Sequence, residues 1–157
     1  MVPMPLSELL SPEAVLPALR VQSKKQALQE ISAAAARLTG IDEGEIFSTL
    51  LQRERLGSTG IGEGIAIPHG KLASMGRLIG LVARLERPID FEAIDGQPVD
   101  LLFLLLAPEG AGADHLKALA RIARALRQPG LVDQARAARD GSALYAVLTQ
   151  SSAPQAA

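Results

Sequence analysis

The sequence has 157 residues, 48% of them hydrophobic and 21% charged, a composition typical of one globular domain. A formal charge of −1 and 3% aromatic residues exclude the basic surplus and stacking surfaces of most nucleic-acid-binding proteins, so nucleic acid is not an expected partner. The absence of cysteine excludes disulfides and thiolate metal sites, and two histidines are too few for an all-histidine zinc site.

The N-terminal segment, residues 1–22, contains four prolines that interrupt any long helix, and we expect it to be irregular. Its first ten residues have no basic start followed by an apolar stretch. We therefore expect no secretory signal and a cytoplasmic protein.

Two amphipathic helices are predicted next. The first covers residues 24–38, with Ser23 as its N-cap and Gly40 at its end. The second runs from about residue 43 to residue 55, follows the capping residue Asp42 and stops at Gly57. Each helix has one apolar face, formed by Leu28, Ile31, Ala35 and Leu38 in the first and by Ile46, Phe47, Leu50 and Leu51 in the second.

The middle of the chain predicts strands. Residues 57–64, GSTGIGEG, hold four glycines in eight positions and should form an irregular loop. Short strands are predicted at residues 65–67, closed by Pro68, and at 78–85, ended by the Arg87–Pro88 break, with a turn over residues 70–76 between them. The nearly continuous apolar run at 99–107 is typical of a strand covered on both faces. It is far shorter than the roughly 20 residues of a membrane-spanning helix, so no membrane insertion is expected.

Helices return after the PEGAGA loop. The third long helix should begin with Asp114 as N-cap, and further helices are predicted at about 131–139 and at 142–149, the last with Ser142 as N-cap. Helices before, between and after buried strands predict an α/β fold with helices on both faces of the sheet. We expect residues 1–150 to form one domain and residues 151–157 to form a flexible tail. The third helix should bury a stripe made of Leu116, Leu119, Ala120, Ala123 and Leu126.

His69 and His115 are the two side chains suited to nucleophilic or acid–base chemistry at neutral pH, because their ordinary pKa is about 6.5. His69 follows a buried strand and a glycine-rich loop, whose backbone N–H groups could approach an anion closely. The same Pro–His–Gly triplet is also typical of a plain surface turn. The loop matches neither a Walker A motif nor a dinucleotide-binding fingerprint.

Other charged residues near these histidines allow two readings each. His115 lies in a predicted first helical turn, a position that stabilises anions but where histidines are often merely solvated. Arg53 and Arg55 end the second helix just before the glycine-rich loop, where they either balance the helix dipole or neutralise a bound phosphate. A basic helix face near His115 is either solvated or a docking surface; it consists of Lys117, Arg121 and Arg124. Acidic residues between the prolines at 88 and 98 and just beyond fit a solvated loop, and no metal site is expected; they are Asp90, Glu92, Asp95 and Asp100.

The segment GSTGIGEGIAIPHGK, residues 57–71, closely resembles the active-site signature of enzyme IIA proteins of the mannitol–fructose type in the bacterial phosphotransferase system. Residues 53–60 (RERLGSTG), residues 88–124 and the ALYAVLT ending resemble the nitrogen-regulatory branch of that family. The resemblance therefore spans nearly the whole chain. It implies a mixed sheet between two helical layers.

The resemblance also implies roles for individual residues. It implies that His69 accepts a phosphoryl group through Nε2 from a phosphorylated HPr-like carrier, that His115 hydrogen-bonds the phosphoryl oxygens and that Arg53, with Arg55 as the alternative, stabilises the phosphate. Neither a cofactor nor a metal is required. Glu63 would bring a carboxylate into the loop, so we expect it to point into solvent. The expected phosphate-binding residues are Gly57, Ser58, Thr59, Gly60 and Gly70.

The resemblance implies a phosphoryl-carrier regulator that binds other proteins according to its phosphorylation state, with transport proteins and sensor kinases among the expected targets. The alternative within the family is a sugar-uptake enzyme IIA that passes the phosphoryl group to a IIB domain. The standalone chain, with no fused transporter or IIB-like domain, favours the regulator. Two other classes are a hydrolase with His69 as general base and Ser58 or Thr59 as nucleophile, and a non-catalytic ligand-binding module.

Overall fold

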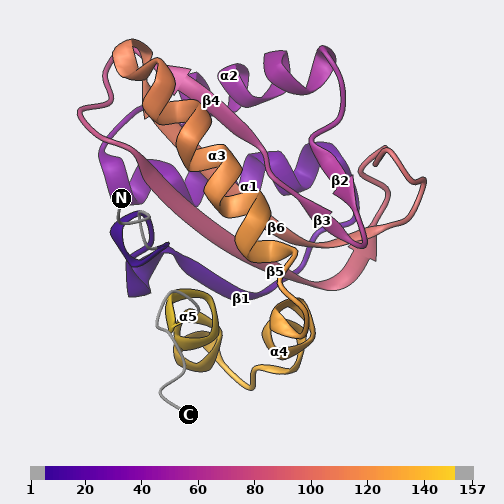
Figure 1. Cartoon of the computed structure of the whole chain (residues 1–157). Coiled ribbons are helices and arrows are strands. Elements are labelled where there is room, and N and C mark those ends of the chain that lie inside the picture. Colours follow the sequence, from indigo (N-terminus) through magenta and orange to yellow (C-terminus); the bar gives the residue numbers. More distant parts are fainter. Residues whose placement is uncertain (1–5, 151–157) are drawn as a thin grey trace.

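A mixed sheet of six strands forms the centre of the computed structural model, which describes residues 6–150 (Figure 1). The strand order is β1–β5–β6–β3–β2, and β4 also pairs with β6. β1/β5, β3/β6 and β4/β6 are parallel pairs, whereas β2/β3 and β5/β6 are antiparallel. The strands are β1 (Val15–Leu19), β2 (Gly60–Gly62), β3 (Ile65–Ala66), β4 (His69–Leu72), β5 (Ile79–Ile89) and β6 (Val99–Pro108).

Helices cover both faces of this sheet. α3 crosses the near face in Figure 1, α1 and α2 lie behind the sheet, and α4 and α5 lie beside β1. This arrangement confirms the predicted three-layer α/β fold. The helices are α1 (Lys24–Thr39), α2 (Glu43–Arg55), α3 (Ala113–Leu126), α4 (Leu131–Ala137) and α5 (Gly141–Gln150), with 3₁₀ turns at Leu6–Glu8, Pro12–Ala14 and Glu109–Ala111.

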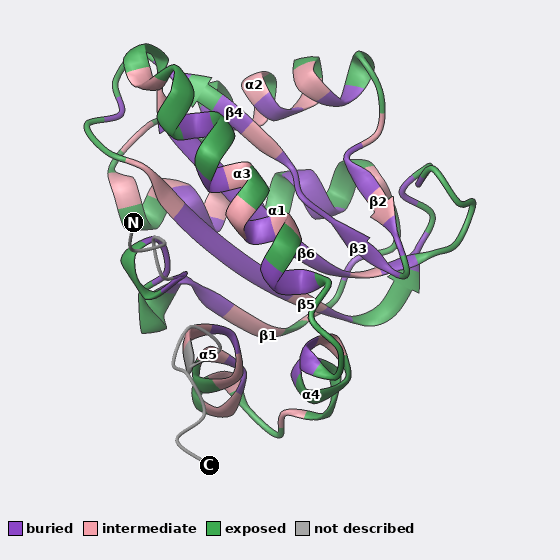
Figure 2. Cartoon of the chain, in the orientation of Figure 1, coloured by how far each residue is buried: buried purple, intermediate pink, exposed green. Residues whose placement is uncertain are grey.

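β6 is the strand around which the core is built. It pairs with strands on both sides, and its residues from 101 to 107 are all buried, as the continuous apolar run predicted (Figure 2). Each leucine buried in this way contributes roughly 2 kcal/mol to stability. The strand is therefore a fixed reference for the shorter strands that pair with it.

The predicted ends of α1 and α2 are confirmed by their capping contacts. Ser23 Oγ accepts a hydrogen bond from the Gln26 N–H at 3.1 Å, and Gly40 ends α1 with a φ of 77°. Asp42 accepts from the Glu45 N–H at 3.0 Å at the start of α2. α2 ends at Arg55, which places its last turn beside the glycine-rich loop.

Two segments expected to be irregular contain strands. Residues 15–19 form β1 despite Pro17, because β1 lies at the edge of the sheet, where a missing N–H is tolerated. Residues 60–62 form β2, since antiparallel pairing with β3 supplies partners that the local glycine content does not reveal. The expected turn over 70–76 was also partly wrong, because β4 continues the chain as a parallel neighbour of β6.

The remaining differences concern element ends, one residue of α1 and the buried face of α3. Leu38, predicted on the apolar face of α1, is 38% exposed. β5 extends through Pro88 to Ile89, past a register irregularity. α3 begins at Ala113 after Gly112, so Asp114 is in its first turn instead of being its N-cap. At the start of α5, the Ala143 N–H donates to Asp140, not to the predicted cap Ser142. α4 ends at Ala137, two residues before the predicted end. The predicted tail, residues 151–157, lies outside the described residues.

The buried stripe of α3 differs from the predicted one. Leu126 is buried as predicted, and Leu119 and Ala123 pack against the core with partial burial, but Leu116 is 67% exposed and Ala120 is also exposed. The buried residues of the helix are His115, Ala118, Ile122, Ala125 and Leu126. The alanine-rich helix offers apolar residues on several faces, so the apolar pattern alone did not determine which face packs against the sheet. The observed face, turned about the helix axis from the predicted one, places His115 under the helix and against the core.

Candidate functional site

Three elements bring Arg53, His69 and His115 together. Arg53 lies in the last turn of α2, His69 is the first residue of β4, and His115 lies in the first turn of α3. His69 pairs in register with Leu105 of β6, the strand that leads into α3. The two imidazole ring centroids are 5.5 Å apart and tilted by 56°.

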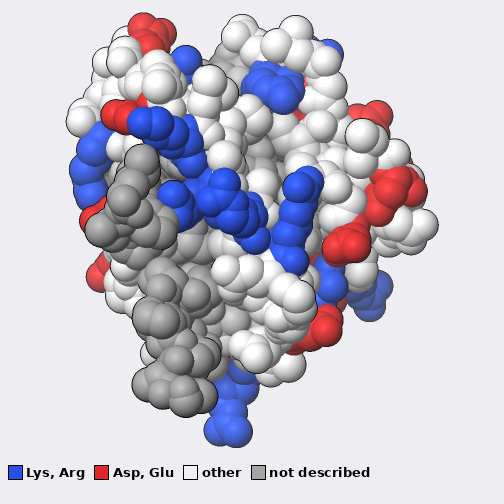
Figure 3. Space-filling view, viewed as in Figure 1, with Lys and Arg blue, Asp and Glu red and all other residues white. Residues whose placement is uncertain are grey.

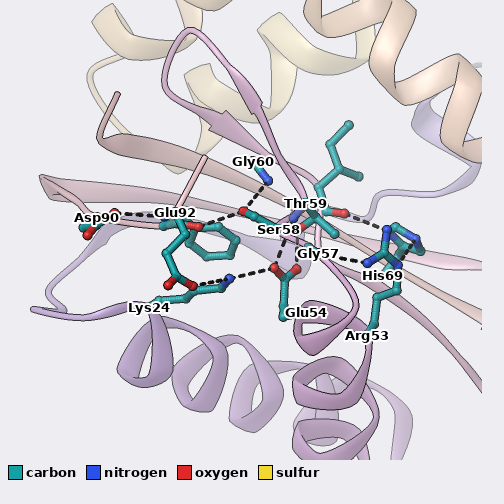
Figure 4. Close-up of polar contacts among 12 residues, drawn as sticks. Lys24, Arg53, Glu54, Gly57, Ser58, Thr59, Gly60, His69, Asp90 and Glu92 are labelled. Atoms are coloured by element: carbon teal, nitrogen blue, oxygen red, sulfur yellow. Dashed lines mark hydrogen bonds and ion pairs between the residues drawn. The ribbon is translucent and has the colours of Figure 1, made fainter. Parts of the chain in front are cut away.

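The hydrogen bonds of His69 distinguish its two ring nitrogens. Nδ1 lies 2.9 Å from the Ile67 carbonyl oxygen, an acceptor, so Nδ1 carries the proton in the neutral ring. Nε2 is then the nitrogen with the lone pair, and it accepts a hydrogen bond from Arg53 Nε at 3.2 Å. The side chain is half-buried and is reached from α2 by the arginine (Figure 4).

The surroundings of His69 favour its neutral form. Burial is the largest influence and lowers the pKa of His69 below its ordinary 6.5. The hydrogen bond to Ile67 and the charge of Glu54 raise the pKa by less than burial lowers it, and the Arg53 cation lowers it further. A neutral imidazole with Nδ1 protonated presents a nucleophilic lone pair at Nε2. The site can therefore form a covalent bond at Nε2 without first losing a proton.

Arg53 is held in place by the start of the glycine-rich loop. Its Nη1 donates to the Gly57 carbonyl oxygen at 3.0 Å while its Nε faces His69. Nη2 has no hydrogen-bond partner among residues 6–150, so it is available to an anion bound beside His69. Arg55, the alternative arginine, is exposed and makes no hydrogen bond or ion pair with His69 within residues 6–150.

His115 is buried without a partner for one of its nitrogens. It is 6% exposed, and its Nε2 has no hydrogen-bond partner among the described residues. Burial lowers the pKa of His115, as do the charges of His69 and Lys71. Most buried polar groups in proteins are hydrogen-bonded, so an unpaired nitrogen near His69 indicates a place for a ligand atom.

The glycine-rich loop is folded on itself. Its N–H groups at Gly57, Thr59 and Gly60 donate to the Glu54 carbonyl, the Glu54 carboxylate and Ser58 Oγ respectively. The Ser58 hydroxyl donates to the Phe91 carbonyl at 2.7 Å, and the Thr59 hydroxyl donates to Glu54. These N–H groups and hydroxyls therefore already have hydrogen-bond partners within the protein.

Gly70 acts through its size. A Cβ at this position would lie 2.7 Å from Thr49 Cγ2 on α2, which is closer than real Cβ contacts. The glycine therefore lets β4 approach α2, the helix that carries Arg53.

Glu54 is a buried residue of this region that the sequence interpretation missed. Its side chain is only 3% exposed, and it pairs with Lys24 of α1 at 3.0 Å (Figure 4). The signal was present in the spacing, since Ile46, Leu50 and Glu54 are four residues apart and share the buried face of α2.

The acidic residues outside this region serve the fold. Glu63 is exposed, as predicted, and its N–H donates to Asp95 at 3.0 Å. That hydrogen bond and one from the Gln97 N–H lower the pKa of Asp95. Asp100 pairs with Arg136 at 2.9 Å. Among residues 6–150 no group of three or more His, Asp or Glu side chains could hold a metal ion.

Basic side chains gather over α3 on the face shown in Figure 3. Lys117 and Arg124 are exposed and Arg121 is partly exposed, and none of them is paired with a carboxylate within the described part of the chain. The exposed Leu116 lies on the same helix, next to His115. Across residues 6–150, every helix is too short or too polar to cross a membrane.

The chain matches the family model described as "Phosphoenolpyruvate-dependent sugar phosphotransferase system, EIIA 2" over residues 8–151. It belongs to this enzyme IIA family. A nitrogen regulatory protein of Bradyrhizobium diazoefficiens is 65% identical over 145 residues, which cover 92% of this chain and 95% of that protein. The nitrogen regulatory protein of Escherichia coli is 44% identical over 145 residues, covering 92% and 89%.

Solved structures agree with this assignment. The nitrogen regulatory protein IIA-Ntr of Neisseria meningitidis has a TM-score of 0.86 at 34% identity and covers 92% of this enzyme IIA chain and 99% of that one. The mannitol IIA of Escherichia coli has a TM-score of 0.74 at 15% identity, which shows the shared fold alone. The predicted resemblance to the nitrogen-regulatory branch of the enzyme IIA family is thereby confirmed, and with it the general role of a phosphoryl carrier.

Proposed function

We propose that this protein is a phosphoryl-carrier regulator of a nitrogen phosphotransferase system, that it accepts the phosphoryl group on His69 Nε2 and that it signals through phosphorylation-dependent protein binding. The observation that carries the proposal is the hydrogen bonding of His69. The Nδ1–H group donates to the Ile67 carbonyl, so Nε2 is the nitrogen left for bond formation, and its lone pair faces Arg53.

The chemistry needs few groups. The Nε2 lone pair attacks phosphorus in line, a new N–P bond forms, and the N–P bond of the phosphorylated histidine on the donor breaks, returning its electron pair to the donor imidazole. The Nδ1 proton stays on His69. Arg53 Nη2 and, in the tautomer protonated there, His115 Nε2 would donate hydrogen bonds to the phosphoryl oxygens, which gives both groups the partner that they lack.

The loop residues contribute by positioning in this proposal. The Gly57 carbonyl orients Arg53, Thr59 anchors the loop to Glu54, and the missing side chain at Gly70 lets Arg53 and His69 meet. Ser58 and Thr59 direct their hydroxyls to Phe91 and Glu54, so a hydrolase would have no nucleophile beside His69.

A phosphorylated HPr-like protein is the proposed donor, and we place the relay in the cytoplasm, where phosphoenolpyruvate is produced. The relatives with the highest identities reported above are named nitrogen regulatory proteins, which supports regulation over sugar uptake. A fructose-specific EIIABC component of Bacillus subtilis is 32% identical, and this chain covers only 23% of it.

Phosphoryl transfer from phosphoenolpyruvate through the purified upstream carriers tests the proposal. Intact mass should show one phosphate that is labile in acid and stable in base. His69→Ala should take up none, because it lacks the acceptor nitrogen. His115→Asn should still be phosphorylated, about tenfold more slowly or with a shorter-lived product, because one stabilising donor is altered.

Phosphate on His69→Ala, or none on the wild type from any phosphorylated carrier, would overturn the proposal. Addition of a IIB domain separates the two family roles. Retention of the phosphate on His69 in its presence is expected of a regulator, whereas its transfer to the IIB domain and then to sugar would establish the uptake enzyme.

A further inference from the structure

Glu54 is a charged side chain buried next to the residues that perform the chemistry. Its carboxylate accepts hydrogen bonds from the Thr59 N–H, at 3.1 Å, and from the Thr59 hydroxyl. Lys24 approaches the same carboxylate at 3.0 Å. Burying a carboxylate costs free energy unless it is paired and hydrogen-bonded. Because any displacement would break these hydrogen bonds, the arrangement holds the groups around Glu54 in one geometry.

A continuous series of hydrogen bonds connects this carboxylate with the His69 ring. Glu54 holds both the N–H and the hydroxyl of Thr59, and the Thr59 carbonyl accepts from the Ile67 N–H at 3.0 Å. The Ile67 carbonyl in turn accepts from His69 Nδ1 at 2.9 Å. The position of the carbonyl that selects the protonated nitrogen therefore depends on the anchoring of Thr59.

The position of Lys24 is explained by the same arrangement. Lys24 is the first residue of α1, where the helix dipole disfavours a cation, and its side chain is only 16% exposed. It lies between Glu54 and Glu92, with Nζ 4.8 Å from the centre of the Phe91 ring (Figure 4). Without this cation, Glu54 would be an unpaired negative charge close to the place where an anionic phosphoryl group arrives.

We propose that Glu54, neutralised by Lys24, is a positioning residue: through Thr59 and Ile67 it keeps the proton of His69 on Nδ1 and the lone pair on Nε2. This inference rests on the proposed function, since it assigns a reason for the reactivity of Nε2. It goes further in assigning the tautomer of the acceptor ring to an ion pair that has no hydrogen bond to that ring among the described residues.

The tautomer of His69 is measured directly by long-range proton–nitrogen correlation NMR on the unphosphorylated protein. The wild type should show a single neutral form with Nδ1 protonated. Glu54→Gln and Thr59→Val should show a mixture of forms or a protonated Nε2, because the Ile67 carbonyl is released. Thr59→Ser keeps the hydroxyl and should restore the wild-type spectrum. Glu92→Gln removes the exposed carboxylate beside Lys24, leaves the Thr59 anchor intact and is the matched control.

Phosphoryl transfer is then measured with the same variants. We expect Glu54→Gln and Thr59→Val to lower the maximal rate about tenfold with the KM for the carrier unchanged, because misplacement affects the reacting atoms and not the docking surface. Thr59→Ser and Glu92→Gln should remain within about twofold of the wild type in this order-of-magnitude argument.

A single Nδ1-protonated form in Thr59→Val, and in Glu54→Gln where that variant folds, would overturn the inference whatever the transfer rates and melting temperatures. The milder Thr59→Val keeps the test decisive if Glu54→Gln fails to fold. Because the spectrum is recorded without phosphate, it remains informative if wild-type transfer fails, an outcome that would remove the proposed function alone.

Discussion

Two arginines in different regions of the molecule use the same side chain differently. Arg84 in β5 donates from Nε to the Pro17 carbonyl at 2.9 Å and from Nη1 to the carbonyls of Ala135 and Ala138 at 2.8 and 2.7 Å. These acceptors belong to β1, to α4 and to the residue just after α4. Arg84 thus connects three segments and stabilises the carbonyl end of a helix, where a cation is favoured.

Arg53 makes fewer contacts within the protein. It donates to one carbonyl, at Gly57, and to the lone pair of His69, and its Nη2 has no partner among residues 6–150. An arginine whose printed hydrogen bonds all go to main-chain carbonyls of separate segments supports the fold, whereas one that donates to the lone pair of a nucleophile can serve a ligand bound there. The two residues therefore predict opposite patterns of damage.

The largest effect is expected from Arg53→Lys. The substitution keeps the charge but removes the planar guanidinium, which contacts His69 and also offers Nη2 to a ligand. The phosphoryl-transfer rate should therefore fall about 100-fold. The free energy of unfolding, measured with urea, should change by less than about 0.5 kcal/mol, because the side chain is half-exposed and not part of the core. An unaltered rate would show that Arg53 takes no part in transfer.

Arg84→Met should produce the reverse pattern. Its loss leaves four carbonyls, those of Pro17, Ala135, Arg136 and Ala138, without this donor, and the free energy of unfolding should fall by about 2 kcal/mol. The transfer rate at a temperature where the variant is folded should stay within about twofold of the wild type, since no contact of Arg84 reaches the histidines. If transfer fell as much as in Arg53→Lys, the division between the two regions would be wrong.

The smallest expected effect is a loss of folding stability at acidic pH. Burial lowers the pKa of both histidines in the folded protein, while in the unfolded chain they keep a pKa of about 6.5. The unfolded state therefore binds more protons as the pH falls below 6.5, and stability should decline from that pH toward the lower folded values. Urea unfolding from pH 8 to pH 5 measures this decline. The double variant His69→Gln/His115→Asn should show a smaller one, and an equal decline would assign the effect to other groups.

The regular parts of the fold could be predicted because their causes are local. The caps Ser23 and Asp42 and the apolar run of β6 determined two helices and a buried strand from neighbouring residues alone. β1 and β4 could not be predicted in this way, because both are short strands that exist only through pairing with β5 and β6. The face of α3 was ambiguous because alanines lie on several of its sides.

The candidate site likewise contains residues that the sequence identified and contacts that only the tertiary structure reveals. His69, His115 and Arg53 were found by their chemistry and by the family signature, and the structure brings them together. The glycine-rich loop was expected to offer free N–H groups, but those of Gly57, Thr59 and Gly60 donate to the Glu54 carbonyl, the buried Glu54 carboxylate and Ser58 Oγ. A hydrogen bond between Glu54 and Thr59 depends on the tertiary position of both residues, which composition and motif matching do not describe.

The close approach at Gly70 has a consequence for how relatives of this protein can diverge. Thr49 and Arg53 are one turn apart on α2, and Gly70 follows His69 directly. The distance between the Thr49 methyl group and the Gly70 backbone therefore determines how near the Arg53 guanidinium lies to the His69 imidazole. A side chain at position 70 would require a smaller residue at position 49 to keep that distance. The two positions should therefore vary together among the relatives of this protein.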